Sequence, residues 1–129
     1  MFKIILAISS LILFLLCVNC ASNSVEGTIG KEFTLNKGQQ IQFKQENLTI
    51  KFVDIPKDNR CVGTCVWEGY ADVAVQVSEN GKTDSIILNT TNQRGYSTTK
   101  NVGQYKIQLT KLDSSSIFSS PSATFLITK

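Results

Sequence analysis

The residues with the most chemical potential in this chain are gathered in one short segment, residues 58–73. It holds the only tryptophan of the protein and the only two cysteines that lie beyond residue 20. Such concentration in sixteen positions calls for a structural or functional cause. The side chains of interest are Asp58, Arg60, Cys61, Cys65, Trp67, Gly69 and Tyr70.

Cys61 and Cys65 are predicted to form a disulfide. A redox pair has two residues between its cysteines and a setting that lowers the thiol pKa, whereas three residues separate these two and the chain has no histidine. A zinc site needs four ligands, and only two thiolates are offered. A calcium site at Asp54, Asp58 and Asn59 lacks the spacing and the bidentate glutamate of an EF-hand.

The other residues of the segment have two interpretations. In the structural one, Trp67 covers the disulfide or plugs the end of the core, Gly69 lets a neighbouring strand approach, and Arg60 pairs with Asp58 or Asp54. In the binding one, Trp67 and Tyr70 are exposed and anchor an interaction surface, because aromatic and arginine side chains dominate interface hot spots. The pattern favours the structural interpretation and leaves the binding one open.

At this segment the chain resembles a family of small exported bacterial proteins, often lipoproteins, with no assigned activity. The shared pattern is Asp-x-Arg-Cys, a few residues, then Cys-x-Trp-x-Gly-x-Ala-x-Val, which here falls on Asp58, Arg60, Cys61, Cys65, Trp67, Gly69, Ala71 and Val73. Val62 stands where the family has proline. The resemblance covers about residues 33–88. It implies export, a β fold and a structural disulfide, and no catalytic role.

Composition removes several classes of function. Without histidine the chain lacks the commonest general base and metal ligand, so Ser-His-Asp and Cys-His catalysis are excluded. The remaining catalytic candidate, the carboxylates of Asp54 and Asp58, is typical of solvated surface groups. We therefore expect a protein that is not an enzyme and that needs no cofactor or metal. The thirteen Lys and Arg are scattered among ten Asp and Glu, which argues against nucleic-acid binding.

The N-terminus predicts export. Lys3 precedes an apolar run, residues 4–16, whose length fits a signal peptide and falls short of the roughly 20 residues of a spanning helix. Residues 16–20, Leu-Cys-Val-Asn-Cys, resemble a relaxed bacterial lipobox, with Cys20 as the lipid-modified first residue of the mature chain. The alternatives are cleavage near Ala21 without a lipid and an uncleaved anchor. The expected location is a bacterial cell-envelope membrane, or the medium if no lipid is added.

The remainder of the chain predicts one small all-β domain. Period-two alternation of apolar and polar residues indicates strands at 32–35, 40–43, 48–52, 70–77, 83–89, 104–109 and 123–128. Asn80-Gly81 favours a type I′ hairpin turn, and Pro56 is expected to end the third strand. No helix longer than two turns is expected. We predict a signal helix at 1–20, a polar tether at 21–31 and, at 32–129, an antiparallel β-sandwich of about seven short strands, loosely immunoglobulin-like.

Two functions remain after these exclusions. The first is a non-enzymatic envelope lipoprotein domain, held to the membrane through Cys20, that serves as a binding or structural module for a protein or another envelope component. The alternative is a secreted protease inhibitor that presents a loop from the sandwich, with the polar stretch 90–103 as the inserted segment. The sequence does not identify a ligand for either.

Overall fold

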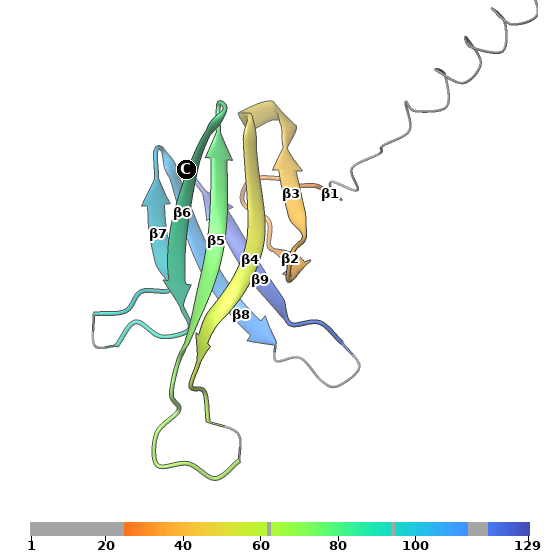
Figure 1. Ribbon diagram of the computed structural model, residues 1–129. Coiled ribbons are helices and arrows are strands. Elements are labelled where there is room, and N and C mark those ends of the chain that lie inside the picture. The colour runs from red at the N-terminus through yellow and green to blue at the C-terminus, as the bar shows by residue number, and fades with distance from the viewer. Residues whose placement is uncertain (1–24, 62, 94, 114–118) are drawn as a thin grey trace, which may run out of the picture.

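The protein is a two-layered β-sandwich, seen in a computed structural model that describes residues 25–61, 63–93, 95–113 and 119–129 (Figure 1). The described residues form nine strands and one short 3₁₀ turn at Lys44–Glu46. The all-β sandwich expected from the alternation is confirmed. The strands are β1 (Val25–Glu26), β2 (Phe33–Asn36), β3 (Gln40–Phe43), β4 (Leu48–Asp58), β5 (Ala71–Glu79), β6 (Lys82–Asn89), β7 (Thr99–Val102), β8 (Tyr105–Asp113) and β9 (Ser122–Thr128).

Each sheet is built mainly from consecutive antiparallel strands. One sheet has the order β1-β3-β4-β5-β6, in which β3 to β6 follow one another along the chain. The other has the order β2-β9-β8-β7. The two-residue strand β1 runs parallel to β3 and is the exception to the antiparallel pairing. The long strands β4 and β5 therefore lie side by side and set the length of the sandwich.

The core lies between the two sheets and follows from the alternation. In β4 and β5 every second side chain, from Leu48 to Phe52 and from Ala71 to Val77, is buried, while the residues between them are at least partly exposed. Successive side chains of a strand point to opposite faces, so each sheet contributes one apolar face. The largest fully buried side chains are Tyr105, Phe43, Phe52, Phe125, Leu35, Ile41, Leu48, Ile50, Leu88, Ile107, Ile127 and Val73.

The expected hairpin turn between β5 and β6 is confirmed. Asn80 has a φ of 50° and Gly81 a φ of 83°, the two positive values that a type I′ turn needs. The turn leads directly into a register in which Glu79 pairs with Lys82. Local turn chemistry thus favours this hairpin, and the Asn80 amide also donates to the Asn47 carbonyl at 3.1 Å.

Strand β4 does not end near Pro56 as expected but continues to Asp58. The pairing of β4 with β5 has two register shifts, between Phe52 and Asp54 and between Asp54 and Lys57. Pro56 lies within the second shift, where it pairs with no residue of β5. On its other side, β4 pairs with β3 only as far as Lys51. Pro56 thus lies on a bulged strand with a free edge, where a missing N–H is tolerated.

Two further strands were not expected from the sequence. Strand β7 occupies residues 99–102 of the stretch expected to be a polar connection, and its four residues show little alternation. Strand β1 and the residues after it belong to the sandwich, although the tether was expected to reach residue 31. The Gly27 amide donates to the Gln42 carbonyl at 2.8 Å, and the side chain of Ile29 packs against the core. The sandwich therefore begins before residue 32.

In the part of the chain that the structure describes, no helix is long and apolar enough to cross a membrane. The expected signal at 1–20, Cys20 and residues 21–24 of the tether lie outside the described residues.

We predict that Ile127→Ala lowers the free energy of unfolding by about 2–5 kcal/mol, because the fully buried side chain leaves a cavity between the sheets. The matched control is Ile87→Ala, at a side chain that is 48% exposed, with an expected loss of less than about 1 kcal/mol. Urea denaturation measures both. Equal losses would contradict the assignment of the core to the space between the sheets.

Candidate functional site

The segment singled out by the sequence is the long connection from β4 to β5, at the lower end of the sandwich in Figure 1. Its two arms continue the pairing of the strands. The Asn59 amide donates to the Tyr70 carbonyl at 2.8 Å, and the Cys61 amide donates to the Glu68 carbonyl at 2.9 Å. The connection is therefore an extension of the β4–β5 hairpin beyond the sheet, with Trp67 near its tip.

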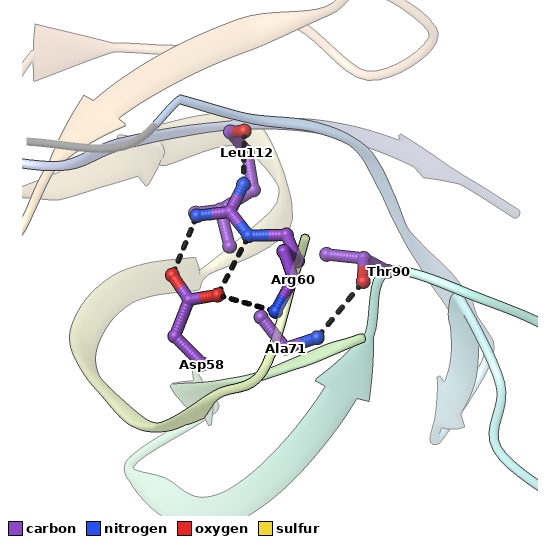
Figure 2. Close-up of polar contacts among 5 residues, drawn as sticks. All are labelled: Asp58, Arg60, Ala71, Thr90 and Leu112. Carbon is purple, nitrogen blue, oxygen red and sulfur yellow. Dashed lines mark hydrogen bonds and ion pairs between the residues drawn. The ribbon is translucent and has the colours of Figure 1, made fainter. Parts of the chain in front are cut away.

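Arg60 fastens this extension to the opposite sheet. Its Nε and Nη2 donate to the two carboxylate oxygens of Asp58 at 2.9 and 2.6 Å, and its Nη1 donates to the Leu112 carbonyl of β8 at 2.7 Å (Figure 2). Planar guanidinium and carboxylate groups match as a two-pronged pair, which fixes direction as well as distance. The sequence left Asp58 and Asp54 open as partners for Arg60; the structure pairs it with Asp58.

The Arg60 guanidinium also sets the charge state of Asp58. The hydrogen bonds from Arg60 hold the pKa of the Asp58 carboxyl below its usual value, and the same contact raises the pKa of Arg60. Both side chains are only partly exposed, at 37% for Asp58 and 20% for Arg60. The pair is thus an ionised clamp at the root of the extension.

The tip of the extension is held by covalent and steric constraints. Cys61 and Cys65 pair as a disulfide, with their Cα atoms 6.1 Å apart. Gly69 has a φ of 69°, and a Cβ there would collide with the Asn59 carbonyl oxygen of the facing arm. The close approach expected of Gly69 is therefore found, within the extension itself. Together the two constraints keep the arms together and limit the conformations open to Trp67.

A second segment, which we call the 90–98 segment and which is described at residues 90–93 and 95–98, is tied to the extension at its root. The Ala71 amide donates to the Thr90 hydroxyl at 3.0 Å (Figure 2). The buried Asn89 donates to Asp72 at 2.6 Å and accepts from the Thr91 amide at 3.0 Å. These bonds hold the start of the polar connection against β5.

Tyr96 joins the two segments through an aromatic stack. Its ring lies on the ring of Tyr70, with centroids 4.5 Å apart and an interplanar angle of 29°. The Tyr96 hydroxyl donates to the Tyr70 hydroxyl at 3.1 Å, and Lys57 donates to the same Tyr70 oxygen at 2.7 Å. The hydrogen bond from Lys57 lowers the pKa of Tyr70, while the bond to Tyr70 raises the pKa of Tyr96.

Trp67 and these tyrosines line a hollow of about 240 Å³ at the end of the sandwich. Its walls come from the arm after Trp67 and from the 90–98 segment, and its residues are Trp67, Glu68, Gly69, Tyr70, Thr91, Gln93 and Tyr96. A second hollow of about 290 Å³, on the disulfide side, shares Trp67 and Glu68 with the first. The Trp67 side chain is 59% exposed and borders both. We call the first the Trp67 hollow and the second the disulfide hollow.

The structure decides between the two interpretations of the motif, residue by residue. Asp58, Arg60 and Gly69 are structural, since they hold the arms of the extension. Trp67 does not plug the core, since its side chain, near the tip of the β4–β5 connection, is 59% exposed. Tyr70 contributes to the Trp67 hollow and to the stack. Cys20, the residue predicted to be lipid-modified, lies outside the described residues.

The carboxylates considered for calcium binding or catalysis are engaged by cations. Asp54 pairs with Lys37 at 2.8 Å, and Asp58 pairs with Arg60. The Lys37 contact lowers the pKa of Asp54. Within the described ranges, no group of three or more Cys, Asp or Glu is arranged to hold a metal ion.

Sequence reasoning missed half of the Trp67 hollow. Thr91, Gln93 and Tyr96 lie in a stretch that the sequence presented only as a polar connection. One signal was available: Tyr96 is the only aromatic residue between 90 and 103. An isolated aromatic in a polar loop either packs on a neighbouring segment or is exposed for binding, and Tyr96 packs on Tyr70.

Comparisons with models of protein families, with curated proteins and with solved structures found no match to this chain.

We predict that Asp58→Asn lowers the free energy of unfolding by about 1–2 kcal/mol at neutral pH, a value discounted for the partial exposure of the pair. Because the folded pKa of Asp58 is lowered, its contribution is complete above the unfolded pKa of about 3.9 and is lost as pH falls through the folded value. Urea denaturation at several pH values should show wild type and variant converging in acid.

The control for this prediction is Asp54→Asn, which breaks the more exposed pair with Lys37. Solvent screens that pair more strongly, so a smaller loss is expected. A difference between wild type and Asp58→Asn that stays constant down to strongly acid pH would contradict the ionised clamp.

Proposed function

We propose that this chain is an exported bacterial envelope lipoprotein whose β-sandwich is a non-enzymatic binding module, with its binding site at the Trp67 hollow. The observation that carries the proposal is an exposed tryptophan at the rim of a hollow that two fixed segments build. Ligand sites are concave, lined by aromatic groups, and supplied with a few polar groups that orient the ligand. The Trp67 hollow has these three properties.

The hollow is held in shape before any ligand arrives. The Arg60 clamp, the Cys61–Cys65 disulfide and the close contact at Gly69 fix the extension, and the Tyr70–Tyr96 stack fixes the second wall. A site that is already ordered loses little conformational entropy on binding. Trp67 has few rotatable bonds and a large surface, so it adds contact area at low entropic cost.

The position of the hollow suits a protein anchored at Cys20. Strand β1 pairs with β3 at Ile41, which in turn pairs with Ile50 of β4. Asn59, which directly follows β4, lies nine residues beyond Ile50, about 25–30 Å at the rise of a strand. The five steps from Cys20 to Val25 span at most about 17 Å. An anchor at Cys20 would thus hold the β1 end near the membrane and the Trp67 hollow away from it.

The non-enzymatic character of the module is supported by the chemistry of its acids. The chain contains no histidine, and Asp54 and Asp58 are each neutralised by a cation. The protease-inhibitor alternative required residues 90–103 to protrude as an insert. Residues 99–102 instead form β7. The Thr98 amide donates to the Asn92 side chain, and this bond ties together the two ends of the loop before β7. No observation favours that alternative.

The lipid anchor predicts a labelling result. Radioactive or clickable palmitate supplied to cells that express the full chain should label the wild type and not Cys20→Ala, because that sulfur is the proposed acceptor. Cys17→Ala is the matched control and should be labelled like the wild type. Equal labelling of Cys20→Ala would overturn the lipoprotein part of the proposal.

The binding role predicts that the exported Cys20→Ala chain, which lacks the lipid acceptor, still sediments with isolated envelopes of its native cell. Trp67→Ala in that background should reduce the bound fraction roughly tenfold, because it removes the main exposed aromatic surface of the hollow. Ile87→Ala is the control, since Ile87 is a similarly exposed apolar side chain on β6. Binding that is lost equally in both variants, or in neither, would count against the Trp67 hollow as the binding site.

A further inference from the structure

We propose that the ligand of the Trp67 hollow is a carbohydrate, specifically a neutral oligosaccharide of at least two sugar rings that lies across Trp67. The inference rests on the proposed binding function and names the chemical class of the ligand. It follows from three observations: the paired hollows that share Trp67, the exposed aromatic surface between them, and the kind of polar groups in the lining.

The paired hollows indicate an elongated ligand. The Trp67 hollow and the disulfide hollow have volumes of about 240 and 290 Å³, and they share Trp67 and Glu68. Each is slightly smaller than the roughly 300 Å³ at which sites for drug-sized ligands begin. A chain of linked rings would place successive rings on either side of the indole, whereas one compact ligand would leave one hollow empty.

The aromatic surface suits the face of a sugar ring. A pyranose has one face rich in C–H groups, whose partial positive charge is attracted to the negative face of an aromatic ring. Trp67 offers the largest such surface of the chain and remains 59% exposed. The stacked rings of Tyr70 and Tyr96 continue the aromatic lining into the Trp67 hollow.

The polar lining suits hydroxyl groups, which both donate and accept. Thr91 and Gln93 each carry a donor and an acceptor on the side chain, and the carboxylate oxygens of Glu68 are acceptors that ligand hydroxyls would donate to. A carboxylate is a strong acceptor for such groups. The lining therefore matches a ligand that presents many hydroxyls without a net charge.

The charge of the lining disfavours anionic ligands. Among the described residues that line the hollow, Glu68 is the only charged one, and Lys57 donates to the hydroxyl of the lining residue Tyr70. A phosphate, a nucleic-acid backbone or an anionic lipid would face this carboxylate, with no lysine or arginine among the described lining residues to offset it. A protein partner would rely on the fully exposed Val66 next to Trp67. Such a contact at Val66 would not use the hydrogen-bonding groups of Thr91, Gln93 and Glu68 in the Trp67 hollow.

The test is a titration of the Cys20→Ala chain with short neutral oligosaccharides of glucose, mannose, galactose and N-acetylglucosamine. Trp67 is the only tryptophan, so its fluorescence reports directly on the site. We expect at least one sugar series to shift the Trp67 emission, with affinity rising from monosaccharide to trisaccharide because both hollows become filled. Calorimetry measures the same binding in variants that lack the indole.

The variants separate the aromatic from the polar contribution. Trp67→Ala should weaken binding at least tenfold, and Trp67→Phe should recover part of the loss because an aromatic face remains. Glu68→Ala should weaken binding roughly tenfold, because a hydrogen bond to a charged group is lost. Ile87→Ala should bind like the wild type. Urea denaturation confirms that each variant is folded, which keeps a loss of binding interpretable.

Two results would overturn the carbohydrate inference. One is a panel in which no sugar binds more tightly than about 10 mM, and the other is binding that Trp67→Ala and Glu68→Ala leave unchanged. If sugars fail while sedimentation with envelopes still depends on Trp67, the binding function stands and its ligand is a protein. If both assays fail, the proposed function fails with the inference.

Discussion

The apolar interface between the two sheets is the constraint on which the rest of this structure depends. Alternate side chains of every long strand are removed from water there, and this burial is the main source of stability for a domain of this size. The interface also determines where the site can be. The connection between β4 and β5 extends past the end of this interface. Its described side chains are not part of the apolar core, so that segment can serve another role.

The extension beyond the interface would be mobile without additional bonds, and it has several. Arg60 is the most informative, because it spans from the root of the extension to β8 in the other sheet through the Leu112 carbonyl. Its partner Asp58 balances the charge, so the guanidinium is both oriented and neutralised. Covalent closure at Cys61 and Cys65 then acts on an extension whose root is already fixed. The motif thus combines three constraints within twelve residues: the Asp58–Arg60 ion pair, the Cys61–Cys65 disulfide and the close backbone approach at Gly69.

The consequence is a rigid aromatic site on a small scaffold. Trp67 is exposed, yet the arms that carry it are paired by backbone hydrogen bonds, and the facing wall is held by the Tyr70–Tyr96 stack. An exposed tryptophan is a liability for solubility unless it has a use. Placement at the far end from β1 would keep that use accessible on a chain tethered at Cys20. The proposed recognition of a ligand would give this exposed side chain a use.

Much of the fold could be predicted because its signals are local. Period-two alternation located the main strands, and Asn80-Gly81 specified its turn, since both depend on the backbone geometry of adjacent residues. The continuation of β4 through Pro56 could not be predicted from local sequence. It depends on the pairing between β3 and β4, which ends at Lys51 and leaves that edge of β4 unpaired at the proline. Strand β7 was missed because an edge strand of four residues needs little alternation. Strand β1 was missed because two residues carry no period.

The sequence by itself determined the all-β class, the hairpin between β5 and β6, and the concentration of Asp58, Arg60, the two cysteines and Trp67 in one segment. Only the tertiary structure decided how that segment is arranged against the rest of the protein. The hydrogen bond from Arg60 to the Leu112 carbonyl and the stacking of Tyr70 on Tyr96 depend on contacts between residues distant in the chain. Such contacts arise when the sheets pack, so no local pattern encodes them.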